Sequence, residues 1–114
     1  MNDTTHANSL DIFIEDRIYK LNVPDTVFRD GIDFFRKMDR DMDQGWQMGT
    51  RFVESPDVVM RAQIAAAKLM VAVETDNTTL ANLMAGYIIS RLPGTTGVRI
   101  DTQGDMLSTQ IIND

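Results

Sequence analysis

The chain has 114 residues and no cysteine, and its 17 acidic residues outnumber its 11 lysines and arginines, which gives a formal net charge of −6. This length suits one domain, and a hydrophobic share of 43% with seven glycines and three prolines excludes a disordered or low-complexity chain. Without cysteine the chain has no disulfide, thiolate metal site or thiol nucleophile. The negative charge argues against nucleic acid and anionic lipid as partners.

The first nine residues are polar and lack both the basic start and the apolar stretch of a signal peptide. We expect a flexible leader over 1–9 and a single domain over 10–114. The longest nearly uncharged stretch, 75–90, is too short and too polar to span a bilayer. We therefore expect a soluble, cytoplasmic protein that does not bind membranes.

Two segments rich in β-forming residues flank a polar centre at 15–17 and predict a β-hairpin over about 10–23. In the second segment Tyr19, Leu21 and Val23 alternate with polar residues, and Pro24 ends the strand because it has no N–H to donate. An amphipathic pattern with three- and four-residue steps then predicts a helix over about 26–44. Gly45 and Gly49 favour fraying or bending directly after it.

The strongest helix signal follows at Ser55-Pro56-Asp57, where a capping serine precedes a proline and an acid. The helix after it has two apolar stripes on nearly opposite sides. One stripe is Val58, Ala62, Ala65, Leu69 and Val73, and the other is Met60, Ile64, Ala67 and Val71. Both sides of such a helix must be buried against other elements. The helix is therefore either the central helix of its domain or is covered on one side by a partner chain.

A third helix is predicted after 75–78, and Pro93-Gly94 ends it. On one side of this helix Asn82, Gly86 and Ser90 form a ridge of small residues along which another backbone could come close. The tail predicts a second hairpin, with strands near 98–102 and 106–112, and we expect the two hairpins to form one antiparallel sheet or to cover the helices. The expected fold is α+β, with an N-terminal β-hairpin, a three-helix core with a central second helix, and a C-terminal β-hairpin.

Three acids at alternate positions, Asp39, Asp41 and Asp43, resemble the start of a calcium-binding loop. The sixth residue from Asp39 is Gln44 where that loop needs glycine, and the twelfth is Thr50 where it needs a carboxylate. A solvated acidic helix end is the favoured interpretation, and a weak cation site is the alternative. His6 is the only histidine and lies in the leader, so we expect no histidine-based catalysis, no metal site and no cofactor.

Trp46 stands between two glycines with Met42 and Met48 nearby. Tryptophan and methionine are favoured at protein contacts because they offer large, adaptable surfaces. Trp46 could instead cap the core or line a ligand pocket. With the second stripe, the candidate partner-contact residues are Trp46, Met42, Met48, Met60, Ile64 and Val71.

These patterns predict a small non-catalytic interaction or regulatory protein that self-associates through helix faces as a homo-oligomer, or binds another protein. The alternative is a small-molecule binding protein or minor enzyme with a pocket between sheet and helices, where Tyr19 or Tyr87 and carboxylates would be the polar groups. A basic face on the first helix gives weak support for DNA binding, because Asp33 interrupts it and the surplus of acids opposes it.

Overall fold

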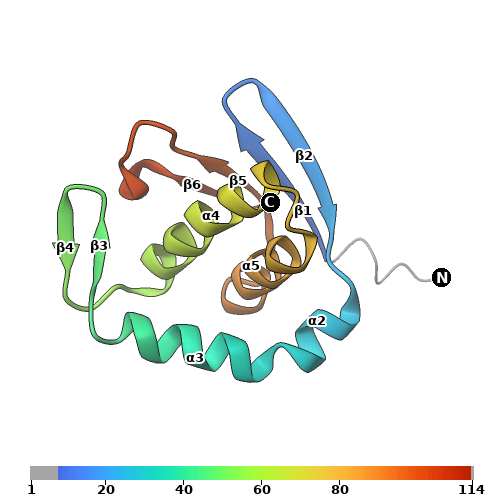
Figure 1. The fold of residues 1–114 in the computed structure, drawn as a ribbon, viewed down its shortest axis with the longest axis horizontal. Coiled ribbons are helices and arrows are strands. Elements are labelled where there is room, and N and C mark those ends of the chain that lie inside the picture. The colour runs from blue at the N-terminus through green and yellow to red at the C-terminus, as the bar shows by residue number, and fades with distance from the viewer. Residues whose placement is uncertain (1–7, 114) are drawn as a thin grey trace.

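The computed structural model describes residues 8–113, which form an α+β fold with four α-helices and six strands in two sheets (Figure 1). Residues 1–7 of the expected leader, His6 included, lie outside the described residues. The last leader residue, Ser9, begins β1, and the carbonyl oxygen of Asn8 before it accepts a hydrogen bond from the Val23 N–H at 2.9 Å. No helix within residues 8–113 is long and apolar enough to cross a membrane.

The main sheet has four strands in the order β2-β1-β5-β6. They are β1 (Ser9–Ile14), β2 (Arg17–Asn22), β5 (Thr95–Ile100) and β6 (Gln110–Asn113). The first two form the expected N-terminal hairpin, in which Ile14 pairs with Arg17 across a two-residue turn. Strand β5 is parallel to β1 and antiparallel to β6. Of the two alternatives expected, one antiparallel sheet was wrong, since the two terminal hairpins join through a parallel pair, while the sheet they form does pack against helices.

One face of this sheet carries much of the core. Leu10, Ile12 and Ile14 of β1 are fully buried, and Val98 and Ile100 lie beside them on β5. The alternation of buried and less buried residues along β1 reflects the two-residue period of a strand.

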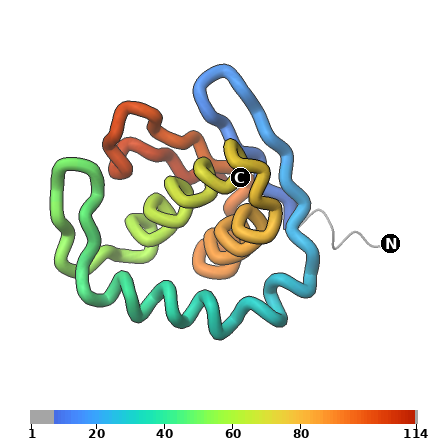
Figure 2. The backbone as a smooth tube through the Cα atoms, viewed as in Figure 1, coloured from blue at the N-terminus to red at the C-terminus, as the bar shows by residue number. Residues whose placement is uncertain are grey.

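Helices α4 (Val58–Glu74) and α5 (Thr78–Arg91) form a helical hairpin that covers the apolar face of the sheet. The side chain of Asp57 caps α4 by accepting from the Met60 N–H at 2.8 Å, so Asp57 and not Ser55 is its N-cap. Asn77 caps α5 in the same way through the Leu80 N–H at 3.1 Å. Figure 2 shows this hairpin lying between the sheet and the segment that precedes β3.

That segment is the predicted helix over 26–44, which Gly31 divides into α2 (Asp25–Asp30) and α3 (Ile32–Met42). A Cβ atom on Gly31 would lie 2.5 Å from the Val27 carbonyl oxygen and 3.3 Å from a methyl group of Leu83. The missing side chain lets the junction lie directly on α5. The described residues therefore contain four α-helices where we expected three.

At Gly86 of α5, another segment of the chain packs closely against the ridge of small residues. A Cβ atom there would lie 2.8 Å from Val27 Cγ1 and 3.3 Å from the Phe35 ring. The segment that approaches the ridge is thus α2–α3 of the same chain. A glycine in the middle of α5 costs helix stability but makes this close packing possible.

The second sheet is a small hairpin of β3 (Trp46–Met48) and β4 (Arg51–Val53), which the sequence did not predict. Gly45 and Gly49 have φ angles of 97° and 74°, and glycine is the residue that adopts such angles without strain. The expected C-terminal hairpin is present with different bounds, since β5 begins at Thr95 and a short 3₁₀ helix, η1 (Met106–Ser108), precedes β6.

Candidate functional site

Trp46 begins β3 and is half-buried against the edge of the core. The ammonium group of Lys68, on α4, lies 5.0 Å from the centroid of the indole ring, a cation–π contact. Met42 and Met48, in contrast, are each only 1% exposed. These two methionines are core residues, so they present no surface to a partner, whereas Trp46 both packs on the core and remains accessible.

The α4 stripe that we expected to mediate self-association is partly exposed. Ile64 is buried in the core, and Met60 and Ala67 are half-buried. Val71, in contrast, is 54% exposed. Of the six candidate contact residues, the structure therefore leaves Trp46, Met60 and Val71 accessible. Val71 lies on α4 one turn after Lys68, so the two side chains share a face of the helix.

A groove of about 250 Å³ lies where α3, α4 and α5 meet, and we call it the three-helix groove. Its lining residues are Phe34, Lys37, Met38, Asp41, Lys68, Leu80 and Met84. A hollow of about 40 Å³ shares three of these residues and extends the groove to Trp46. Apolar side chains from α3 and α5 thus form a surface that continues to the one tryptophan, with charged groups among them.

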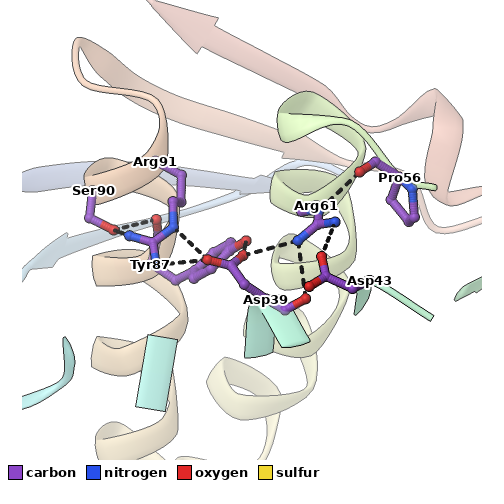
Figure 3. A network of polar contacts seen from close by, with 7 residues as sticks. All are labelled: Asp39, Asp43, Pro56, Arg61, Tyr87, Ser90 and Arg91. Atoms are coloured by element: carbon purple, nitrogen blue, oxygen red, sulfur yellow. Dashed lines mark hydrogen bonds and ion pairs between the residues drawn. The ribbon is translucent and has the colours of Figure 1, made fainter. Parts of the chain in front are cut away.

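The position of α3 beside this groove depends on a network around Asp39 (Figure 3). One carboxylate oxygen of Asp39 accepts from the Tyr87 hydroxyl at 2.5 Å. The other accepts from Nε and Nη2 of Arg91 at 3.0 and 2.9 Å. Arg61 of α4 donates to the Asp39 carbonyl oxygen at 3.1 Å and to the carboxylate at 3.4 Å. We call these four residues the Asp39 clamp, because they join α3 to both α4 and α5.

The two arginines of the clamp also bind groups nearby. Arg61 donates to the Pro56 carbonyl oxygen at 2.9 Å and to the Asp43 carboxylate at 2.7 Å. Arg91 donates to Ser90 Oγ at 3.1 Å. Both guanidinium groups are already hydrogen-bonded within the chain. The clamp therefore holds the helices together and is not an open anion-binding site.

The protonation states of the clamp follow from its geometry. Burial raises the pKa of the Asp39 carboxyl, but hydrogen bonds from Tyr87, Arg91 and Arg61 outweigh it and hold that pKa below its ordinary value. Burial, together with the hydrogen bond to Asp39, raises the pKa of the Tyr87 hydroxyl far above its ordinary range. Asp39 is therefore ionised and Tyr87 protonated at neutral pH, and neither group is poised for proton transfer.

The three acids that resembled a calcium loop are each paired with basic side chains. Asp39 belongs to the clamp, Asp41 pairs with Lys37 at 3.0 Å, and Asp43 pairs with Arg61. Helix α3 continues through Met42, so the first two acids project from a regular helix and do not converge. Within residues 8–113, no three histidine or acidic side chains come together as metal ligands would.

No local sequence pattern indicates the clamp. The only signal was an arginine on each of two largely apolar helices, at Arg61 and Arg91, because a buried guanidinium needs a carboxylate partner. Their shared partner lies 22 and 52 residues away, and no local pattern pairs residues over such distances.

A second groove, of about 390 Å³, lies between β2 and the turn from α4 to α5. Tyr19 lines this groove, whereas Tyr87 is fully buried and belongs to the Asp39 clamp. The three-helix groove and this second groove thus lie on different sides of the α4–α5 hairpin. Searches against protein-family models, curated proteins and solved structures gave no match to this chain.

Proposed function

We propose that the protein is a small non-catalytic interaction protein that self-associates through the three-helix groove and the α4 residues beside it. The observation that carries this proposal is the joining of this apolar groove to Trp46, with Phe34 of its lining still 38% exposed. Met38 and Met84 also line the groove but are only 8% and 1% exposed, so they form its floor, while Phe34, Leu80 and Lys68 provide the accessible surface.

A second copy of the chain suits this surface because the surface carries both halves of a self-complementary contact. In a two-fold dimer each patch meets its own copy, so it must contain both hollow and projecting groups and both signs of charge. The groove provides the hollow, and Val71 projects beside it. Lys68 contacts the Trp46 ring but makes no ion pair within the described residues, and Asp41, which pairs with Lys37, lines the same groove. Across the two-fold axis, Lys68 of one copy can face the Asp41 carboxylate of the other.

The Asp39 clamp supports the proposal by fixing one wall of the groove. Phe34 and Met38 stand on α3, and Asp39 on that helix is bonded to α4 and α5. A surface that is already ordered loses less conformational entropy on association than a mobile one.

Light scattering of Val71→Glu and Val59→Glu variants tests the proposal. Both valines are exposed residues of α4, and twelve residues of helix place them about 18 Å apart. We expect a dimer at tens of micromolar protein, which Val71→Glu weakens by roughly thirtyfold, as loss of a central contact does, while Val59→Glu has little effect.

Circular dichroism should show that both variants keep the fold of the parent chain. A parent chain that remains monomeric at several hundred micromolar, or an equal loss of association in the two variants, would contradict the proposal.

A further inference from the structure

Strand β2 lies at one edge of the main sheet, and within residues 8–113 β1 is the only strand that pairs with it. The Val23 N–H donates to the Asn8 carbonyl oxygen, and in an antiparallel pair such hydrogen-bonded positions alternate with open ones. Leu21, Tyr19 and Arg17 therefore bond to β1, while the main-chain groups of Ile18 and Lys20 point away from it. The open edge thus presents donors and acceptors with the spacing of a further strand.

The second groove runs beside this edge. Four consecutive residues of β2, from Ile18 to Leu21, line it on one side. The other side consists of small or apolar residues of the two helices and the polar turn between them. These include Ala72, Val73 and Ala81, with Asp76, Asn77 and Thr78 from the turn region.

A groove between an edge strand and a helix accepts an extended peptide, which adds a strand to the sheet and places alternate side chains in the groove. A small-molecule pocket usually has a few polar groups that converge on the ligand. Here the charged residues of the lining, Lys20 and Asp76, are exposed, and the main-chain groups of the edge are the ordered donors and acceptors. The geometry therefore fits a polypeptide strand better than a small molecule.

The charge of β2 indicates whether the added strand would come from a second copy of this chain or from a different polypeptide. Strand β2 carries Arg17 and Lys20 and no acid, although the chain as a whole has a net charge of −6. Arg17 already pairs with Glu74 at 3.0 Å, so two copies of β2 paired edge to edge would chiefly bring their two Lys20 ammonium groups to one seam, and lysine on an edge strand is a common protection against such pairing. An acidic partner strand would gain from the same charges.

Lys20 is free enough to make that contact. Its ammonium group pairs with Asp11 at 3.3 Å, but 77% of the Lys20 side chain is exposed, and an exposed pair of this kind contributes little. Lys20 also points to the sheet face opposite the helices, as its cross-strand partner Asp11 does. A residue of an added strand opposite Lys20 would therefore lie outside the groove, where an acidic side chain is favoured.

From this juxtaposition of an open edge, a groove and a basic strand, we propose that β2 binds an extended segment of another polypeptide. The segment adds to the sheet as a further strand. Its apolar side chains at alternate positions enter the groove, and an acidic side chain lies opposite Lys20. This site is separate from the self-association surface, which lies on the other side of the α4–α5 hairpin.

The test uses the full chain labelled with ¹⁵N and capped peptides of alternating valine and glutamate. Titration to millimolar peptide should give saturable shifts of the Ile18 and Lys20 amide signals. A peptide of the same sequence with N-methylated amides along one edge should bind at least about tenfold more weakly, since it cannot donate those hydrogen bonds. A peptide of alternating valine and lysine should also bind several-fold more weakly.

Two substitutions separate main-chain pairing from charge. Ile18→Pro removes one outward N–H, which an edge strand tolerates, and should weaken binding roughly tenfold relative to the matched Ile18→Val variant. Lys20→Glu should reverse the preference, so that the lysine peptide binds better than the glutamate peptide, and this result does not depend on the proline variant folding.

Several outcomes would overturn the proposal. They are the absence of saturable shifts at millimolar peptide, equal binding of the N-methylated peptide, and an unchanged peptide preference in Lys20→Glu. Edge-to-edge dimers of the parent chain through β2 would do so as well. Val71→Glu should leave peptide binding intact, so failure of the self-association proposal can be told apart from failure of this one.

Discussion

The two sides of the α4–α5 hairpin are held by different forces. The side toward the sheet packs on apolar residues such as Leu10, Ile12 and Val98, all of them fully buried. The side toward α3 also has apolar contacts, through Phe35 and Met38, but there the Asp39 carboxylate binds two arginines and a tyrosine. The α3 side therefore has a charged network that joins three helices, whereas the polar contacts of the sheet side are separate ones, such as Gln63 donating to the Thr109 carbonyl oxygen at 2.9 Å and Arg17 pairing with Glu74 at 3.0 Å.

The two sides therefore contribute differently: one mainly stabilises the fold, and the other determines where α3 lies. Apolar burial is nearly independent of direction, so the sheet side can supply most of the stabilisation without fixing fine geometry. Hydrogen bonds and ion pairs depend on distance and angle, so the α3 side defines where α3 lies and with it the wall of the three-helix groove. A charged network that is mostly buried gives little net stability, but losing one member leaves the others unpaired.

The largest effect should come from a cavity on the sheet side. Ile12→Ala removes a fully buried side chain that faces the helices, and we expect it to lower the free energy of unfolding by about 3–4 kcal/mol. Ile18→Ala is the matched control, since Ile18 is exposed on the neighbouring strand and its loss should cost less than about 0.5 kcal/mol. Urea denaturation of both variants measures the difference, and similar losses would contradict the packing described for β1.

Breaking the clamp should have the next largest effect. Asp39→Ala leaves Arg61, Arg91 and the Tyr87 hydroxyl without their carboxylate, and we expect a loss of about 2–3 kcal/mol. The figure is moderate because the Asp39 side chain is 29% exposed and water can replace part of the lost interaction. Asp33→Ala, an exposed acid on the same helix, should change stability little. Equal stability of Asp39→Ala and the parent in urea would show that α3 does not depend on the clamp.

Local signals explain which elements the sequence predicted. The alternation in β2 and the caps at Asp57 and Asn77 involve residues within a few positions of one another, so the N-terminal hairpin, α4 and α5 could be identified. The division at Gly31 could not, because it depends on contact with Leu83 of another helix. The strands β3 and β4 have three residues each, which is too short for a periodic pattern.

The candidate contact residues differ in whether the structure leaves them accessible. Apolar spacing indicated Trp46 and the α4 stripe, and Trp46 and Val71 are accessible in the structure. The same spacing also selected Met42, Met48 and Ile64, which are buried, because periodicity identifies an apolar face without showing what covers it. The clamp and the open edge of β2 depend on tertiary contacts and strand order, which one sequence does not contain.

Filling the ridge on α5 tests how closely the α2–α3 segment is seated. Gly86→Ala places a methyl group 2.8 Å from Val27 Cγ1, and the strain should exceed the gain of about 1 kcal/mol in helix propensity. We expect a net loss of about 1–2 kcal/mol in urea denaturation. Combined with Val27→Ala, the loss should be smaller than the sum of the two single losses by about 1 kcal/mol. Additive losses would mean that Gly86 has another role.

The smallest expected effect is a difference in acid sensitivity between the parent and Asp39→Asn. Hydrogen bonds from Tyr87, Arg91 and Arg61 hold the pKa of the Asp39 carboxyl in the folded chain below its unfolded value, although burial alone would raise it. The unfolded chain therefore takes up a proton at a higher pH than the folded chain does. The contribution of the ionised carboxylate is complete above the unfolded pKa, near pH 4, and declines as the pH falls through the lower folded value.

Asparagine keeps the size of the side chain but has no charge, so it resembles the protonated acid at every pH. The stability gap between the parent and Asp39→Asn should be constant from about pH 5 to 8 and should narrow by about 1 kcal/mol as the pH is lowered toward 3. Urea denaturation at each pH measures the gap, with Asp33→Asn as the control because that exposed acid makes no ion pair within residues 8–113. A gap that stays constant into the acid range would mean that the Asp39 charge does not hold α3 in place, and that its apolar contacts alone position the groove wall.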